Sequence, residues 1–301
     1  KGTIMDISFE LYKVFYYVAT TLNFSEASRQ LYISQSAVSQ AVKSLESKLG
    51  HPLFLRNTKK VTLTPEGEAL LRYVEPAINL LYNAERQISH AHPSEAPLRM
   101  GASDTICRYF LIPYFKRFHK EFPNIPIKVT NSTSGGCVSL LHNNKVDFIV
   151  TNAPNPHLTN KDMCCTILEF QDVFVAGKKF FNLQEQIVSL KQLTQYPILM
   201  LDKTSTTSEF IHQFFIKNGV SLTPEAELSS NDLLLDFARI GLGITVVPDY
   251  VLKSHKKDFY PLKLKETIPK RQLVLAYNPK LLSSPAAKKF LDYLHCDNLM
   301  A

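Results

Sequence analysis

The sequence predicts a fold of the α + α/β class, in which a helical first part is joined by one long helix to an α/β second part. Three observations support this prediction. Apolar residues recur at helical spacing up to residue 50, a heptad-like apolar repeat occupies residues 64–91, and short apolar strands alternate with helices from residue 98. A length of 301 residues with 45% hydrophobic content suits about two domains with packed cores.

Residues 34–50 are predicted to form a helix with two different faces. Val38, Val42, Leu45 and Leu49 repeat at i, i+4, i+7 and i+11, which places them on one side. Ser34 suits the N-cap, and Gly50 suits the left-handed residue that follows the last turn. The opposite side carries amides, hydroxyls and a cation, the groups that hydrogen-bond base edges in a major groove: Gln35, Ser36, Ser39, Gln40 and Lys43.

The neighbouring segments predict a winged helix-turn-helix around this helix. Two helices precede it, over residues 8–20 and 24–31, and the first is expected to bury Phe9, Val14, Phe15, Val18 and Ala19. Two short alternating segments, 52–56 and 61–63, follow as a hairpin with a basic tip, or wing. From residue 34 to residue 60 a single acid, Glu46, accompanies five bases, an excess that suits phosphates: Lys43, Lys48, Arg56, Lys59 and Lys60.

Several separate strings in this region stand at consistent spacing. They are Phe24-Ser-Glu-Ala-Ser, Ser34-Gln-Ser-Ala-Val-Ser, Leu45-Glu, Leu49-Gly50, Leu53-Phe-Leu-Arg56 and Leu63-Thr-Pro-Glu-Gly67. Together they resemble the DNA-binding domain of LysR-type transcriptional regulators. The resemblance implies that double-stranded DNA is a partner of residues 5–63, and we expect the natural chain to start at Met5. Bases would be read by Gln35, Ser36, Ser39 and Gln40, and phosphates or the adjacent minor groove would be held by Lys43, Arg56, Lys59 and Lys60.

Residues 64–91 are predicted to form one long helix, with Thr64 as N-cap and a kink at Pro76. Its apolar residues step by four and three, which is typical of a coiled-coil seam: Leu70, Val74, Ala77, Leu81, Ala84 and Ile88. The resemblance implies a linker helix through which a homodimer or homotetramer forms. Packing of the same stripe against the chain's own C-terminal domain is the alternative. Residues 92–97, rich in proline and polar residues, are expected to form a hinge.

Residues 98–301 are predicted to form two α/β lobes, because their strands and helices exceed what one compact sheet holds. Lobe I is expected over about 98–164 and 268–301, and lobe II over about 165–267. Two crossing segments, near 164–170 and 264–269, would join them. This part resembles the effector-binding domain of the same family, itself similar to periplasmic solute-binding proteins. The resemblance is weaker here, apart from residues 145–150 and 240–248.

Three stretches place short polar residues just beyond predicted strands, at residues 103–105, 132–136 and 202–207. Each opens a helix, and helix N-termini suit anions. The resemblance implies that these stretches line the cleft between the lobes, so we expect a small anionic effector such as a carboxylate, an amino acid or an oxyanion. Each hydroxyl alone could also be only an N-cap, and Asn231 is a weaker candidate. The candidate effector residues are Ser103, Thr105, Thr133, Ser134, Asn152, Lys203, Thr204 and Ser205.

Other features of the sequence limit the range of possible functions. Five cysteines at irregular spacing predict a reducing compartment and no metal site, although Cys137 at a helix start could be either an inert core residue or a redox-active thiol. No apolar stretch of membrane-spanning length is visible, so we expect a cytoplasmic protein without cofactors. Common catalytic motifs are missing, which disfavours an enzyme. The alternative hypothesis is a two-lobe small-molecule binding protein or enzyme whose N-terminal domain only mediates dimerisation.

Overall fold

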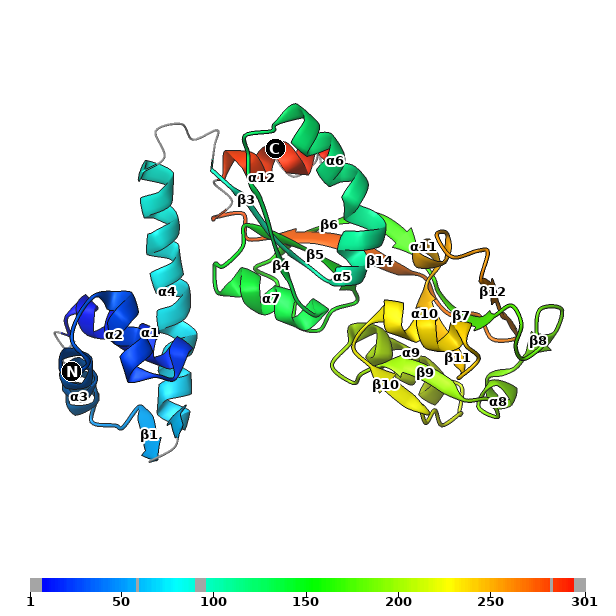
Figure 1. Cartoon of the computed structure of the whole chain (residues 1–301), viewed down its shortest axis with the longest axis horizontal. Coiled ribbons are helices and arrows are strands. Elements are labelled where there is room, and N and C mark those ends of the chain that lie inside the picture. Colours follow the sequence, from blue (N-terminus) through cyan, green and yellow to red (C-terminus); the bar gives the residue numbers. More distant parts are fainter. Residues whose placement is uncertain (1–6, 58–59, 90–95, 282–283, 295–301) are drawn as a thin grey trace. The chain divides into compact units, whose positions relative to one another are not determined.

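The computed structural model describes residues 7–57, 60–89, 96–281 and 284–294, and the chain divides into two compact units (Figure 1). The first unit contains helices α1 (Phe9–Thr21), α2 (Phe24–Leu31) and α3 (Gln35–Leu49), the hairpin of β1 (Phe54–Asn57) and β2 (Lys60–Leu63), and helix α4 (Pro65–Ser89). The predicted winged helix-turn-helix and long helix are therefore present. Most of the predicted hinge lies outside the described residues.

The core of the first unit forms where α1, α2 and α3 meet. Phe15, Val18, Ala27, Val38 and Leu45 are completely buried, and the Phe15 ring packs on that of Phe54 with centroids 5.5 Å apart. Asn23 begins α2, with its side chain accepting from the backbone N–H groups of residues 25 and 26. The expected burial of Phe9 is wrong: its side chain is 46% exposed, because it lies in the first turn of α1, before the buried stripe begins.

Helix α4 runs without interruption through Pro76. The Oγ1 atom of Thr64 caps it, accepting from the N–H of Gly67 at 3.0 Å. Only part of the expected seam is exposed, because Val74 is buried in the core of this unit and Leu70 is half-buried against it. Ile78, which lies outside that seam, is buried as well. The apolar side chains that remain exposed are Tyr73, Ala77, Leu80, Leu81, Ala84 and Ile88.

Two five-stranded sheets form the second unit, as the two-lobe prediction requires. The first has the order β4-β3-β5-β14-β6, made of β3 (Leu98–Ala102), β4 (Ile127–Asn131), β5 (Phe148–Ala153), β6 (Met163–Phe170) and β14 (Arg271–Tyr277). The second has the order β10-β9-β11-β7-β12, made of β7 (Asp172–Gly177), β9 (Ile198–Leu201), β10 (Ala226–Leu228), β11 (Ile244–Pro248) and β12 (Phe259–Pro261). In each sheet three parallel strands are followed by two antiparallel pairings, so β14 in the first sheet and β7 in the second run opposite to their neighbours.

Helices connect the parallel strands of each lobe. Lobe I has α5 (Asp104–Ile106), a π-helical turn (Cys107–Leu111), α6 (Ile112–Glu121), α7 (Ser134–His142) and α12 (Pro285–Tyr293). Lobe II has α8 (Leu190–Leu193), α9 (Thr206–Lys217), α10 (Asn231–Arg239) and α11 (Asp249–Leu252), with the short pair β8 (Ile187–Val188) and β13 (Lys263–Leu264). The π turn lies between α5 and α6, and Leu262 separates β12 from β13.

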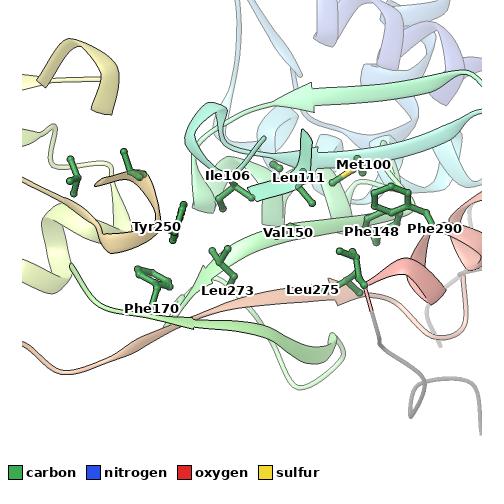
Figure 2. Packing of buried hydrophobic residues seen from close by; sticks show 14 of the residues in the cluster. Met100, Ile106, Leu111, Phe148, Val150, Phe170, Tyr250, Leu273, Leu275 and Phe290 are labelled. Carbon is green, nitrogen blue, oxygen red and sulfur yellow. The ribbon is translucent and has the colours of Figure 1, made fainter. Parts of the chain in front are cut away.

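The chain crosses between the lobes twice, once at Gln171 and once after β13. The Nε2 atom of Gln171 donates to the carbonyl oxygen of Ile268, so the two crossings are tied together. Figure 2 shows the continuous apolar core along β14, from Phe148 and Phe290 at one end to Phe170 and Tyr250 at the other. Because Phe170 precedes one crossing and Tyr250 follows a lobe II strand, this core extends into both lobes.

Candidate functional site

Helix α3 presents the polar face that the sequence predicts. Gln35, Ser36, Gln40 and Lys43 are exposed and Ser39 is half-buried, whereas Val38, Val42 and Leu45 on the other side are completely buried. The Oγ atom of Ser34 accepts from the N–H of Ala37, and Gly50 ends the helix with φ of 73°. The burial of one face fixes the orientation of the other, so the amide and hydroxyl side chains face outward as a set.

The basic wing is present as the hairpin of β1 and β2. Arg56 lies in β1, opposite Val61, and Lys60 is exposed at the start of β2. The Arg56 side chain and the whole of Lys59 lie outside the described residues. The Glu46 carboxylate is hydrogen-bonded within the unit, because its Oε1 atom accepts from the N–H groups of Leu53 and Phe54 at 2.8 and 3.3 Å. The single acid of this region is thus directed toward the base of the wing.

A cavity of about 570 Å³ lies between the two sheets of the second unit. Its walls begin where β3, β4 and β5 of lobe I and β9, β10 and β11 of lobe II end or have just ended. The carboxyl ends of parallel strands are where α/β folds generally bind ligands. The lining residues are Ser103, Asp104, Thr105, Asn131, Ser132, Thr133, Ser134, Asn152, Leu201, Asp202, Ser205, Thr207, Ser229, Ser230, Asn231, Pro248 and Tyr250.

The structure brings six of the eight candidate effector residues to this cavity, namely Ser103, Thr105, Thr133, Ser134, Asn152 and Ser205. Lys203 and Thr204 are exposed and do not line it. The Thr204 hydroxyl instead donates to Asp202 Oδ1 at 2.5 Å, which closes the turn before α9. Thr207 lies within the predicted stretch 202–207 but was not among the single candidates, and Ser230 and Tyr250 were missed. Thr207 and Ser230 lie at the starts of α9 and α10 and share the helix-start signal, whereas Tyr250 had no comparable signal.

Direct hydrogen bonds join the two lobes beside the cavity. Asn231 Nδ2 donates to Thr105 Oγ1 at 2.9 Å. The Tyr109 hydroxyl of the π turn donates to Asp232 Oδ1 at 2.5 Å and lies 3.0 Å from His255 Nε2. Burial, together with the Asp232 hydrogen bond, raises the pKa of Tyr109, so this hydroxyl stays protonated and able to donate. The lobes are therefore held together by polar contacts that a ligand between them would adjoin.

A buried ion pair lies behind the cavity wall. Arg271 Nη1 donates to Asp172 Oδ2 and to Thr207 Oγ1, both at 3.0 Å, and the side chains of Arg271 and Asp172 are completely buried. The Arg271 guanidinium also lies over the rings of Phe170 and Phe210. Burial raises the pKa of Asp172, and the attraction of Arg271 opposes this rise. Arg271 is the first residue of β14, just after the second lobe crossing. Its hydrogen bond to Thr207 therefore connects the buried ion pair to the cavity wall.

The described residues contain no group of three or more histidine, cysteine, aspartate or glutamate side chains that could hold a metal ion. No helix in the described ranges is long and apolar enough to cross a membrane.

Cys137 is completely buried at the start of α7. Burial raises the pKa of its thiol to about 12, with a smaller contribution from Cys107, and a backbone hydrogen bond with Ser132 opposes the rise only partly. A raised thiol pKa lowers the thiolate fraction at neutral pH, which disfavours a redox role.

We expect iodoacetamide at pH 8 to modify the exposed Cys164 of the folded chain before Cys137, since Cys137 combines burial with a raised pKa. Peptide mapping by mass spectrometry would measure both sites. The unfolded chain is the control, in which both thiols should react. Modification of Cys137 in the folded chain at the rate of Cys164 would contradict the burial argument.

Two family models match this chain. The model of the LysR substrate binding domain matches residues 91–297, and that of the bacterial regulatory helix-turn-helix protein of the lysR family matches residues 9–68. This chain belongs to the LysR family. It is a DNA-binding transcriptional regulator with an effector-binding domain, and not an enzyme.

Relatives of this LysR-type regulator include full-length matches. It is 26% identical over 286 residues to the HTH-type transcriptional activator CmpR of Synechocystis, covering 94% of this chain and 93% of that one. It is 25% identical over 298 residues to the RuBisCO operon transcriptional regulator of Allochromatium vinosum, covering 96% of each.

Solved structures share the fold. A full-length OxyR variant from Pseudomonas aeruginosa has a TM-score of 0.70 at 18% identity, with 96% of this chain and 95% of that chain covered. The LysR family regulator CbnR has a TM-score of 0.65 at 17% identity, with 96% and 98% covered.

Proposed function

We propose that α3 lies in the major groove of double-stranded DNA. Gln35, Ser36, Ser39 and Gln40 then read base edges. Phosphates or the adjacent minor groove are held by Lys43, Arg56, Lys59 and Lys60. The observation that carries this proposal is the outward polar face of α3 on a helix whose other face is completely buried. A structure of CbnR is described as a complex with target DNA, which supports DNA as a partner of this chain.

The functional form in this proposal is a homodimer or homotetramer assembled through α4. Tyr73 and Ile88 are 78% and 86% exposed, and Ala77, Leu81 and Ala84 between them are exposed as well. A stripe of this kind favours a second helix as its cover, because apolar area is then removed from water. Two copies would also present two recognition helices to two half-sites.

The cavity between the lobes is the proposed effector site. Effector binding would change the contacts between Thr105 and Asn231 and between Tyr109 and Asp232, and so the relative position of the lobes. This movement would be transmitted to the paired DNA-binding domains and alter how they hold DNA. Only a ligand with different affinities for the two arrangements can produce such a shift.

Recovery of genomic fragments bound by the full chain, followed by sequencing, tests the DNA-binding proposal. We expect a shared, two-fold symmetric sequence among the fragments, as a dimer of reading helices requires. Fragments without a shared sequence would favour the alternative hypothesis, in which the N-terminal domain only mediates dimerisation.

Replacing Lys60 with alanine should weaken binding to all DNA sequences alike, because a phosphate contact carries no base information. Titrations at several salt concentrations should show the slope of log affinity against log salt becoming shallower by about one. Lys217→Ala removes another exposed lysine, in the effector-binding domain, and should leave the slope unchanged. A Lys60 effect limited to some sequences would contradict a phosphate role.

Changes at Thr105 and Ser134 should weaken effector binding without unfolding the domain. We expect Thr105→Val and Ser134→Ala each to reduce affinity by roughly two- to tenfold, the usual worth of one hydrogen bond. Isothermal titration of a ligand found by thermal-shift screening would measure this. Ser221→Ala, at an exposed position outside the cavity, is the matched control. Unchanged affinity in both cavity variants would contradict the assignment of this cavity as the effector site.

A further inference from the structure

The charges that line the cavity are of one sign. Asp104 and Asp202 contribute carboxylates, and no lysine, arginine or histidine is among the described lining residues. Arg108 lies 4.0 Å from Asp104 and offsets part of its charge, but both side chains are more than half exposed. Arg271 is close to Thr207 but is itself paired with Asp172 behind the wall. A ligand bearing only negative charge would meet repulsion that no lining cation balances.

The same cavity offers many hydrogen-bond donors. Six lining hydroxyl oxygens already accept from a protein N–H, so each keeps its own hydrogen for another partner. Within the described residues none of these hydroxyls donates to a protein acceptor. They belong to Ser103, Thr105, Thr133, Ser205, Thr207 and Ser230. The first turns of α7, α9 and α10 add the positive ends of three helix dipoles.

Acceptors are present as well, and two of them are buried amide oxygens. Asn152 and Asn231 both line the cavity and are 9% and 6% exposed. Their Oδ1 atoms contact no donor among the described residues. Buried acceptors are normally satisfied, because leaving one without a partner costs free energy. These two oxygens, together with the two carboxylates of the same lining, indicate a ligand that donates hydrogen bonds and carries positive charge.

We propose that the cavity binds a zwitterion of the α-amino acid type. Its carboxylate lies at the hydroxyl hydrogens and helix N-termini, and its ammonium group lies at Asp202, Asp104 and the buried amide oxygens. This inference rests on the proposed effector site and names the class of its ligand. Of the three classes that the sequence suggests, the amino acid alone satisfies both the donors and the acceptors of the lining. The Arg271 contact supports the donor side, because it uses one lone pair of the Thr207 hydroxyl and leaves the hydroxyl hydrogen for the cavity.

Matched probes test the proposal in the full-length chain. Each of the twenty common L-amino acids is compared by thermal shift and titration with the carboxylate that lacks the amino group and the amine that lacks the carboxylate. For alanine these are propanoate and ethylamine. Sulfate and phosphate complete the set. We expect at least one amino acid to bind, with loss of either charged group weakening it by about tenfold or more.

Asp202→Asn separates the zwitterion from a simple anion. Asparagine keeps the Oδ1 acceptor that Thr204 uses, so the turn before α9 is retained while the charge is removed. We expect the variant to bind the amino acid about tenfold or more weakly and the matched carboxylate more tightly. Glu209→Gln removes an exposed acid of the same helix outside the cavity and should change neither affinity.

The outcomes distinguish failure of the zwitterion proposal from failure of the effector-site proposal on which it rests. If a carboxylate, sulfate or phosphate binds as tightly as any amino acid, and Ser134→Ala weakens that binding, the effector site stands and the zwitterion is overturned. Failure of every amino acid to bind also overturns the zwitterion, whereas binding of the chain to DNA, measured separately, is unaffected. Equal affinity of Asp202→Asn and the parent chain for the amino acid would overturn the role of that carboxylate and the inference with it.

Discussion

Replacing Arg271 with methionine should destabilise the effector-binding domain by about 3–5 kcal/mol, because the Asp172 carboxylate would remain buried without its partner. For a domain of this size the melting temperature should fall by roughly 6–20 °C. Calorimetry of the full-length chain would measure the shift. Arg239→Met is the matched control, since Arg239 also lies over a phenylalanine ring but pairs with exposed acids, and its loss should cost about 1 kcal/mol or less.

The defect of Arg271→Met should depend on pH in a definite direction. Burial already raises the pKa of Asp172, and removal of Arg271 takes away the attraction that lowers it. A group with a raised pKa in the folded state contributes stability below its unfolded pKa and loses it as the pH rises through the folded value. The deficit should therefore be largest at neutral pH and shrink toward acidic pH. A pH-independent deficit would show that lost packing, and not an unpaired charge, is responsible.

A second change, Asp172→Leu, tests the same ion pair by removing its carboxylate. Combined with Arg271→Met, it removes the unpaired carboxylate and should recover most of the lost stability, as replacement of a buried ion pair by apolar residues often does. The double variant also removes the donor to Thr207. Its effector affinity therefore reports whether Arg271 orients that hydroxyl, independently of its contribution to stability.

The DNA-binding domain could be predicted closely because its information is local. The period of Val38, Val42 and Leu45, with Ser34 and Gly50 at the two ends, defines both the limits of α3 and the face that points outward. The same argument was incomplete for α4. A heptad pattern indicates an apolar stripe but not what covers it, and Val74 proves to be covered by the domain's own core.

The effector cavity was only partly predictable because its walls depend on side-chain direction. Strand ends and helix starts could be located from the sequence, so most of the hydroxyl candidates reach the cavity. Which of two neighbouring residues faces inward depends on the turn, and the Asp202–Thr204 hydrogen bonds leave Lys203 exposed at the surface. The Arg271–Asp172 pair joins positions 99 residues apart, and nothing in the local sequence of either residue points to the other.

Replacing Gln35 with alanine should cost roughly 1–3 kcal/mol at one base pair of the operator, the usual worth of a direct base contact. The side chain is exposed in the first turn of α3, and its removal leaves the buried face of the helix intact. Discrimination at that base pair should relax, whereas affinity for non-specific DNA should stay nearly unchanged because phosphate contacts remain. Titrations against an operator and its single-base variants would measure both quantities.

Gln213→Ala gives the matched control for this prediction. Gln213 is an exposed glutamine on α9, in the effector-binding domain, so its loss should leave operator affinity and discrimination as they are. If Gln35→Ala weakens all DNA sequences equally, the residue holds the backbone, and the reading face must be assigned to other side chains of α3. If it changes nothing, the assignment of Gln35 to base reading is wrong. The test then passes to Gln40, which is also exposed and lies five residues further along α3.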